Sequence, residues 1–161
     1  RDLHKEYRRQ RQMCIRDSVS GDVMASTWSD KRTVTLKQAI GVCASITPWN
    51  FPIAMITRKV APAIAAGCTI VIKPAEQTPL SALAIAELAH RAGIPAGVVN
   101  VVTADAEQSI AVGKVLCSSP IVRHVSFTGS TPVGRILMEQ CAPDGEKNRT
   151  GTWWSCTVHR L

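Results

Sequence analysis

No stretch of the sequence reaches the roughly 18 consecutive apolar residues that a membrane-spanning helix needs. The first residues are also too polar and too basic to form the core of a signal peptide. We therefore expect no membrane partner and a cytoplasmic location, with the mitochondrial matrix as the alternative. The 161 residues, of which 45% are apolar and 19% charged, suffice to bury one core. A single globular domain, or a part of a larger one, is predicted.

The cysteines form no metal-binding pattern. The sequence has no Cys-x-x-Cys pair and no cluster of cysteine and histidine of the kind that holds a metal ion. We therefore predict no metal site and interpret the thiols as reduced and mostly structural. The six cysteines are Cys14, Cys43, Cys68, Cys117, Cys141 and Cys156.

The positive charge is concentrated near the start of the chain. Of the net charge of +7, residues 1–20 contribute +3, and residues 21–143 contribute +3 over a far longer span. The basic run at residues 8–11 is not followed by an RNA-binding aromatic pattern or a helix-turn-helix pattern. We interpret this run as a solvated tail and predict no nucleic-acid partner. A small basic nucleic-acid-binding protein is the alternative function that this basic run leaves open.

Strand and helix patterns alternate between residues 33 and 141. Short apolar runs predict strands, whereas apolar residues at helical spacing, opened by proline or closed by glycine, predict helices. This alternation indicates right-handed βαβ units and an α/β fold with a doubly wound parallel sheet, whose ligands bind beyond the carboxyl ends of the strands. We expect strands at residues 33–36, 41–47, 69–72, 98–102 and 125–128, and helices at residues 53–66, 80–92, 107–116 and 132–141.

Residues 46–52, Ile-Thr-Pro-Trp-Asn-Phe-Pro, are the most informative stretch. Because proline restricts its own φ angle and the residue before it, Pro48 and Pro52 are expected to end the strand and hold Asn50 in one pose. A rigidly held carboxamide can donate hydrogen bonds to a developing oxyanion. An ordinary proline-rich turn is the alternative that this stretch alone leaves open.

Two further strand ends carry polar residues. Gly129 and Ser130 precede a predicted helix, where free backbone N–H groups and the helix dipole favour an anion such as a cofactor phosphate. Taken alone, however, this feature favours an ordinary helix cap. Lys73 and Glu76 follow a buried strand and could hold the hydroxyls of a ribose; the alternative is a surface ion pair of little energetic value. No Gly-x-Gly-x-x-Gly occurs, so the ordinary Rossmann fingerprint is absent.

Four stretches in this order resemble the aldehyde dehydrogenase superfamily. They are residues 46–52, Ala-Ala-Gly-Cys-Thr-Ile-Val-Ile-Lys-Pro-Ala-Glu-Gln-Thr-Pro at 65–79, Ala-Gly-Ile-Pro-Ala-Gly-Val-Val-Asn-Val-Val at 92–102, and Ser-Phe-Thr-Gly-Ser-Thr-Pro-Val-Gly at 126–134. Their detail is most similar to the succinate-semialdehyde branch. The resemblance implies part of a Rossmann-like NAD-binding domain, and an enzyme, expected to be a homo-oligomer, that oxidises a small aldehyde to the acid with NAD, or alternatively NADP.

The resemblance also assigns roles to individual residues. It makes Asn50 catalytic, as a donor to the oxyanion that forms when a cysteine thiolate attacks the aldehyde, and it makes Arg58 the partner of the far carboxylate of succinate semialdehyde. Glu76 favours NAD, because a carboxylate would repel the 2′-phosphate of NADP. The residues that it places near the cofactor are Ile46, Thr47, Pro48, Trp49, Lys73, Ala75, Glu76, Gly113, Phe127, Gly129 and Ser130.

The ends of the chain do not follow the family pattern. We expect residues 1–20 to be a non-native leader, residues 21–143 a partial NAD(P)-binding domain, and residues 144–161 an out-of-frame tail. The codons of Trp153 and Trp154, read one nucleotide later, give Gly-Gly, which suits the family segment Glu-Leu-Gly-Gly that carries the general base. Without that base and the nucleophilic cysteine, the chain is expected to be inactive alone. A non-catalytic nucleotide-binding module is the second hypothesis.

Overall fold

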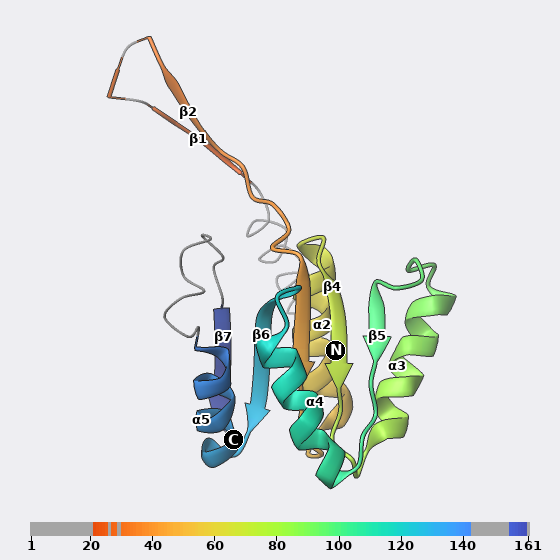
Figure 1. Ribbon diagram of the computed structural model, residues 1–161. Helices are drawn as coiled ribbons and strands as arrows, with labels where there is room; N and C mark the ends of the chain where they lie inside the picture. Colours follow the sequence, from red (N-terminus) through yellow and green to blue (C-terminus); the bar gives the residue numbers. More distant parts are fainter. Residues whose placement is uncertain (1–20, 26, 29, 143–154, 161) are drawn as a thin grey trace, which may run out of the picture.

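The computed structural model describes residues 21–25, 27–28 and 30–142, together with the backbone of residues 155–160. At its centre lies a five-stranded parallel sheet with the strand order β5-β4-β3-β6-β7 (Figure 1). Its strands are β3 (Val42–Ile46), β4 (Thr69–Lys73), β5 (Val99–Val101), β6 (Val122–Gly129) and β7 (Ser155–Arg160).

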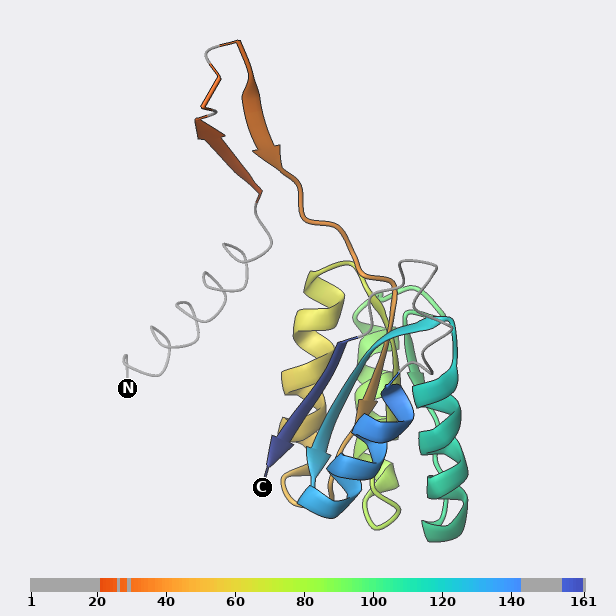
Figure 2. The same ribbon diagram turned by 60° about the vertical axis from the view of Figure 1, so that its left-hand side comes forward.

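Helices cover both faces of this sheet (Figures 1 and 2). The helices α2 (Pro52–Ala65) and α3 (Pro79–Arg91) contribute to one core, and α4 (Ala106–Ser118) and α5 (Thr131–Cys141) to the other. Because side chains alternate along a strand, the neighbours Cys43 and Ala44 belong to opposite cores. The predicted α/β fold with a doubly wound parallel sheet is therefore confirmed.

Local sequence signals set the ends of the helices. Proline occupies the first turn of α2, α3 and α5, where its missing N–H costs no hydrogen bond. Asp105 caps α4 by accepting a hydrogen bond of 2.7 Å from the backbone N–H of Gln108. After α2, Gly67 adopts a φ of +78°, a conformation that favours glycine. These signals explain why the predicted helices lie within about two residues of the observed ones.

Strand β6 begins three residues before the predicted start at residue 125. Its first residues pair with β3 through a register shift between Val42 and Cys43, which pair with Val122 and His124. The irregularity interrupts the apolar alternation in the sequence, so the beginning of the strand carried no period-2 pattern.

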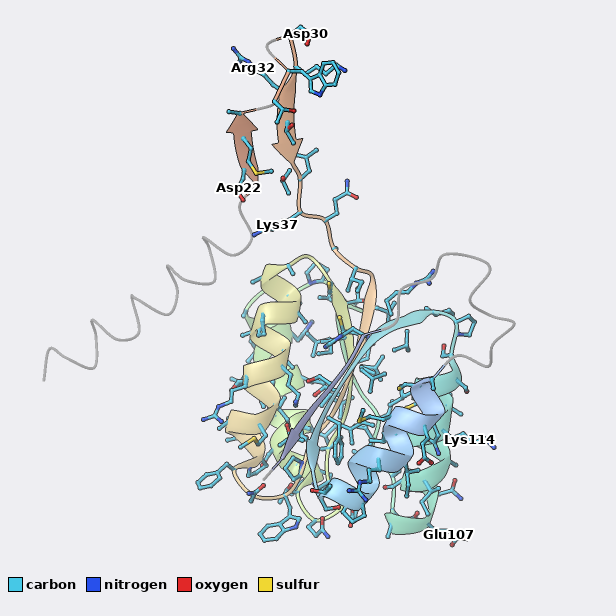
Figure 3. All side chains as sticks on the ribbon, turned by 90° about the vertical axis from the view of Figure 1, so that its left-hand side faces the viewer. Asp22, Asp30, Arg32, Lys37, Glu107 and Lys114 are labelled. Carbon is cyan, nitrogen blue, oxygen red and sulfur yellow. The ribbon has the colours of Figure 1, made fainter. Side chains whose placement is uncertain are left out.

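Strands β1 (Asp22–Ala25) and β2 (Arg32–Thr35) form an antiparallel hairpin that projects from the sheet; Figure 3 shows its labelled residues Asp22, Asp30 and Arg32 well away from the helices. The strand predicted at residues 33–36 therefore exists, but it belongs to this hairpin and not to the parallel sheet. Strand β1 was not predicted, because all four of its residues are exposed and give no apolar pattern.

Strand β7 was not predicted either. Its backbone pairs in parallel with β6, from His124 with Ser155 to Gly129 with Arg160. The strand lies within residues 144–161, for which an out-of-frame tail is expected, and the origin of that segment stays a prediction.

The chain reverses direction across the sheet between β3 and β6. From β3 it runs outward to β4 and β5, and then α4 returns it to β6 on the other side of β3. The neighbours β3 and β6 therefore flank the topological switch point, where the connections leave toward opposite faces. Open parallel sheets bind their ligands at the carboxyl ends of the strands beside such a point.

Four of the six cysteines lie in the described region, where they are buried in the cores and form no disulfide: Cys43, Cys68, Cys117 and Cys141. This agrees with their interpretation as reduced, structural residues. Cys14 and the side chain of Cys156 lie outside the described residues.

Cys43 is expected to resist alkylation in the folded protein. Burial, together with the neighbouring thiol of Cys68, raises the pKa of its thiol to about 12. Because the thiolate is the nucleophile, iodoacetamide at neutral pH should modify Cys43 only after unfolding. Peptide mass spectrometry of samples labelled with and without denaturant measures this difference. Equal labelling of Cys43 in both samples would contradict it.

Candidate functional site

Three residues predicted from the sequence form one row at the carboxyl ends of neighbouring strands. Ile46 of β3 pairs with Lys73 of β4 on one side and with Phe127 of β6 on the other. Ile46 and Phe127 pack into the core on the α4/α5 face, and the parallel register places Lys73 on the same face. One residue further, the N–H of Thr47 donates to the carbonyl of Lys73 at 3.2 Å. The row therefore lies at the switch point.

The turn between β3 and α2 contains Asn50. The next residue, Phe51, has φ 52° and ψ 53°, a left-handed conformation that is uncommon for a residue with a side chain. Its carbonyl accepts the first hydrogen bond of α2, from the N–H of Met55 at 3.0 Å. Such strain persists only where the surroundings enforce it, and Pro48 and Pro52 restrict the turn on both sides.

The carboxamide of Asn50 has unused hydrogen-bonding capacity. Its Oδ1 atom is buried and has no hydrogen-bond partner among the described residues. A buried oxygen of this kind is usually satisfied by water or a ligand, and the –NH2 end of the same group offers two donors. The neighbouring side chains of Trp49 and Phe51 are 62% and 72% exposed. The turn thus combines a fixed amide with an exposed apolar surface.

The N-terminus of α5 lies directly after β6. Gly129 ends the strand, and Ser130 is the N-cap residue, although its side chain makes no capping hydrogen bond. The first turn of α5 contains no acidic residue that would compete with an anion. Free N–H groups and the helix dipole at this end therefore favour a negatively charged ligand.

Lys73 and Glu76 form an ion pair that is buried at the lysine and exposed at the glutamate. The Nζ atom of Lys73 lies 4.0 Å from Oε2 of Glu76, and the side chain of Lys73 is only 8% exposed. Burial lowers the pKa of Lys73, and the charge of Glu76 opposes this shift. Gln77 donates to Oε1 of Glu76 at 2.8 Å, which orients the carboxylate. A separation of 4.0 Å leaves donors and acceptors on both groups free for a polyol.

Three further predicted residues lie outside the row. Ala75 is buried beside Lys73, and Gly113 is buried in α4, where an added Cβ would meet Leu137 of α5 at an ordinary 3.5 Å. Arg58 is exposed on α2, the helix that covers the opposite face of the sheet. The structure therefore does not bring Arg58 into the row that contains Lys73 and Phe127.

A polar group beneath α2 was missed by the sequence analysis. The Nζ atom of Lys59 donates to Oγ of Ser126 at 2.8 Å, and burial lowers the pKa of Lys59 to about 8. Ser126 pairs with Ser45 of β3, whose Oγ is buried without a partner among the described residues. The only sequence signal was the position of Lys59 three residues after the buried Ile56, on the inner side of an amphipathic helix.

The Oγ1 atom of Thr47, one of the predicted cofactor residues, is likewise buried without a partner among the residues described. Across the described part of the chain, no group of three or more His, Cys, Asp or Glu side chains is arranged to hold a metal ion.

The sequence of the chain also matches a protein family. The sequence profile of the aldehyde dehydrogenase family matches residues 9–150. The chain belongs to the aldehyde dehydrogenase family. The match begins inside the expected leader at residues 1–20 and extends beyond residue 143, so both expected boundaries stay predictions.

Curated relatives are close in sequence but much longer. The succinate-semialdehyde dehydrogenase [NADP(+)] of Escherichia coli (strain K12) is 64% identical over 129 residues, which are 80% of this chain and 26% of that protein. A glutarate-semialdehyde dehydrogenase of Pseudomonas putida is 60% identical over 129 residues, again 80% of this chain and 26% of the relative. The chain thus spans about a quarter of the length of these relatives.

Solved structures share the fold. The crystal structure of an NADP-dependent enzyme of E. coli aligns with a TM-score of 0.77 and 56% sequence identity, over 89% of this chain and 27% of that one. The family and the succinate-semialdehyde dehydrogenases that the sequence motifs resemble are therefore confirmed as the relatives of this chain. The roles of the individual site residues stay predictions.

Lys59 should make the stability of the protein depend on pH. Its pKa is lowered from 10.5 to about 8 in the folded state. Between these values the unfolded chain holds a proton that the folded chain has released, so the free energy of unfolding should rise with pH across this window. Lys59→Met should flatten the rise, although Lys73 retains its own contribution.

Urea unfolding below pH 8 and near pH 10.5 measures this effect. Lys114→Met, at an exposed position of α4 labelled in Figure 3, removes the same charge from the surface and is the matched control. An equal pH dependence in Lys59→Met and in the wild type would rule out the buried ammonium as its source.

Proposed function

We propose that this chain supplies the cofactor-binding part of an enzyme that oxidises succinate semialdehyde to succinate with NAD. The observation that carries the proposal is the row of Lys73, Ile46 and Phe127 at the switch point, with the Asn50 turn following the same β3 strand and the N-terminus of α5 following β6. Membership of the aldehyde dehydrogenase family, whose cofactor is NAD or NADP, supports the same assignment.

The residues present fit a dinucleotide. The buried ammonium of Lys73 and the carboxylate of Glu76 would hold the two hydroxyls of the adenosine ribose, and the free N–H groups after Gly129 would meet the pyrophosphate. The buried Oγ1 atom of Thr47, which has no hydrogen-bond partner among the described residues, is a polar atom that a bound ligand would satisfy. The cofactor would supply the oxidant that takes up the hydride from the former aldehyde carbon.

Asn50 acts on the reacting carbonyl. Its carboxamide donates a hydrogen bond to the oxyanion that forms when a thiolate adds to the aldehyde. The left-handed Phe51 and the two flanking prolines hold the amide in place before the substrate arrives, so little reorganisation is needed during the reaction. The strained turn therefore contributes to catalysis by fixing the position of the amide donor.

Arg58 receives the far carboxylate of the substrate. Its exposed guanidinium on α2 offers a planar set of donors that matches a carboxylate with two parallel hydrogen bonds. The P. putida relative is named for glutarate semialdehyde, which is one carbon longer and carries the same terminal carboxylate. A carboxylate-bearing semialdehyde is therefore the proposed substrate class. Within it we prefer the four-carbon succinate semialdehyde, because the E. coli relative has a higher sequence identity to this chain than the P. putida relative.

A non-catalytic nucleotide-binding module is the second candidate function. The observation that favours it concerns the cysteines: the four in the described region are buried within the two cores. An accessible thiolate is required for attack on the aldehyde, so none of these four is suited to that role. In the first proposal, the nucleophile and the general base belong to the remainder of a longer enzyme.

The expected assembly and location extend this proposal. We propose a homo-oligomeric parent enzyme with a small aldehyde as its substrate and no nucleic-acid partner, located in the cytoplasm or the mitochondrial matrix. Among the described helices, none is both long and apolar enough to cross a membrane.

Titration of the full chain with NAD tests the proposed function. Calorimetry should detect binding, whereas mixing the chain with NAD and succinate semialdehyde should produce no NADH. Circular dichroism establishes that the sample is folded. A folded chain that does not bind NAD would contradict the cofactor assignment, and NADH production would contradict the placement of the nucleophile elsewhere.

Glu76 should set the preference for NAD over NADP. A carboxylate beside the ribose repels a 2′-phosphate, so Glu76→Ser should improve NADP binding relative to NAD by about tenfold, or ~1.4 kcal/mol. Calorimetric titration with each cofactor gives the ratio of the two Kd values. Glu87→Ser removes an equal charge from an exposed position on α3 and should leave the ratio unchanged. If both variants shift the ratio equally, the preference arises from overall charge.

A further inference from the structure

The ring of Phe127 occupies the space where Gly129 would carry a side chain. A Cβ atom added to Gly129 would lie 2.5 Å from Cζ and 2.9 Å from Cε2 of Phe127. Both distances are too short for carbon atoms in contact, so any other residue at position 129 would have to displace the ring. The backbone of Gly129 has no positive φ, so its conformation alone does not require glycine.

The ring of Phe127 has little room to move away. Its side chain is 4% exposed and belongs to the core that includes Ala44, Val125 and Leu137. Protein cores are packed at the density of organic crystals, and a ring forced outward disturbs its neighbours. The ring also lies in the row with Ile46, so a displacement would be transmitted to the centre of the candidate site.

The contact lies where strand β6 passes into helix α5. Gly129 is the last residue of the strand, and Ser130 caps the helix whose first N–H groups face the proposed pyrophosphate. Phe127 is two residues earlier on the same face of the strand, so its ring lies along the backbone of Gly129. The ring therefore lies against the residue from which the chain leaves the sheet.

We propose that Phe127 is a positioning residue: its ring packs over Gly129 and aligns the start of α5 for an anionic ligand. Glycine is required at position 129 by this ring and not by close approach of the ligand to the backbone. The consequence for cofactor binding rests on the proposed function, whereas the steric relation between the two residues does not.

The test compares Gly129→Ala, Phe127→Leu and the double variant with the wild type in the full chain. Gly129→Ala should weaken NAD binding by about tenfold, because the methyl group displaces the ring and the start of α5. Leucine lacks the far ring atoms that the methyl group would meet, so the double variant should bind NAD within about threefold of Phe127→Leu alone. Calorimetry measures the four Kd values.

The binding data can overturn the proposal in two ways. If Gly129→Ala binds NAD with the same Kd as the wild type, the ring moves aside without affecting the ligand site. Binding by the double variant that stays as weak as in Gly129→Ala, in a folded protein, would show that the ligand itself needs the glycine.

If the wild type does not bind NAD, that result overturns the proposed function alone. Thermal unfolding then still tests the steric relation between Phe127 and Gly129. Gly129→Ala should lower the Tm, and its effect should be much smaller in the Phe127→Leu background. Gly113→Ala, whose added methyl group meets Leu137 at an ordinary 3.5 Å, is the control for stability and should not lower the Tm. Additive effects of the Gly129 and Phe127 substitutions on the Tm would overturn the steric claim.

Discussion

The parallel register of β3 with β4 and β6 is the constraint on which the rest of the structure depends. It aligns Ile46 with Lys73 on one side and with Phe127 on the other, so that β3 and β4 end at the same level while β6 continues to Gly129. A slip of one residue would move each of these side chains to the opposite face. The packed cores on both faces oppose such a slip, because it would move Val125 and Ile72 out of the cores that they fill and into the opposite ones.

The two faces of the sheet carry different polar chemistry. Lys73, Gly129 and Ser130 gather toward the α4/α5 side, where a negatively charged ligand is favoured, whereas Lys59, Ser126 and Ser45 lie beneath α2. Two buried oxygens without a hydrogen-bond partner among the described residues, on Ser45 and Thr47, lie in β3 and directly after it. Burial of a polar atom without a partner costs free energy. A core selected for stability alone would therefore have apolar groups at these positions near the switch point.

Much of the candidate site was predictable, because its residues sit beside strong local signals. Pro48 and Pro52 mark the turn around Asn50, and Gly129 with Ser130 marks a helix start in any context. The hairpin β1–β2 was not recognised as a separate unit, since a strand exposed on both faces has no apolar period. The Lys59–Ser126 hydrogen bond spans 67 residues of sequence, and no local pattern encodes such a contact.

The sequence by itself determined the family, the alternation of strands and helices, and the polar turns that follow the strands, because each depends on neighbours within a few residues. Only the tertiary structure decided which strand ends share a row, that Arg58 lies on the opposite side of the sheet from Lys73, and that Lys59 is half-buried against Ser126. It also supplied a steric reason for Gly129, in the ring of Phe127. These properties depend on strand order and on packing between helices and sheet, which arise only when distant segments of the chain come into contact.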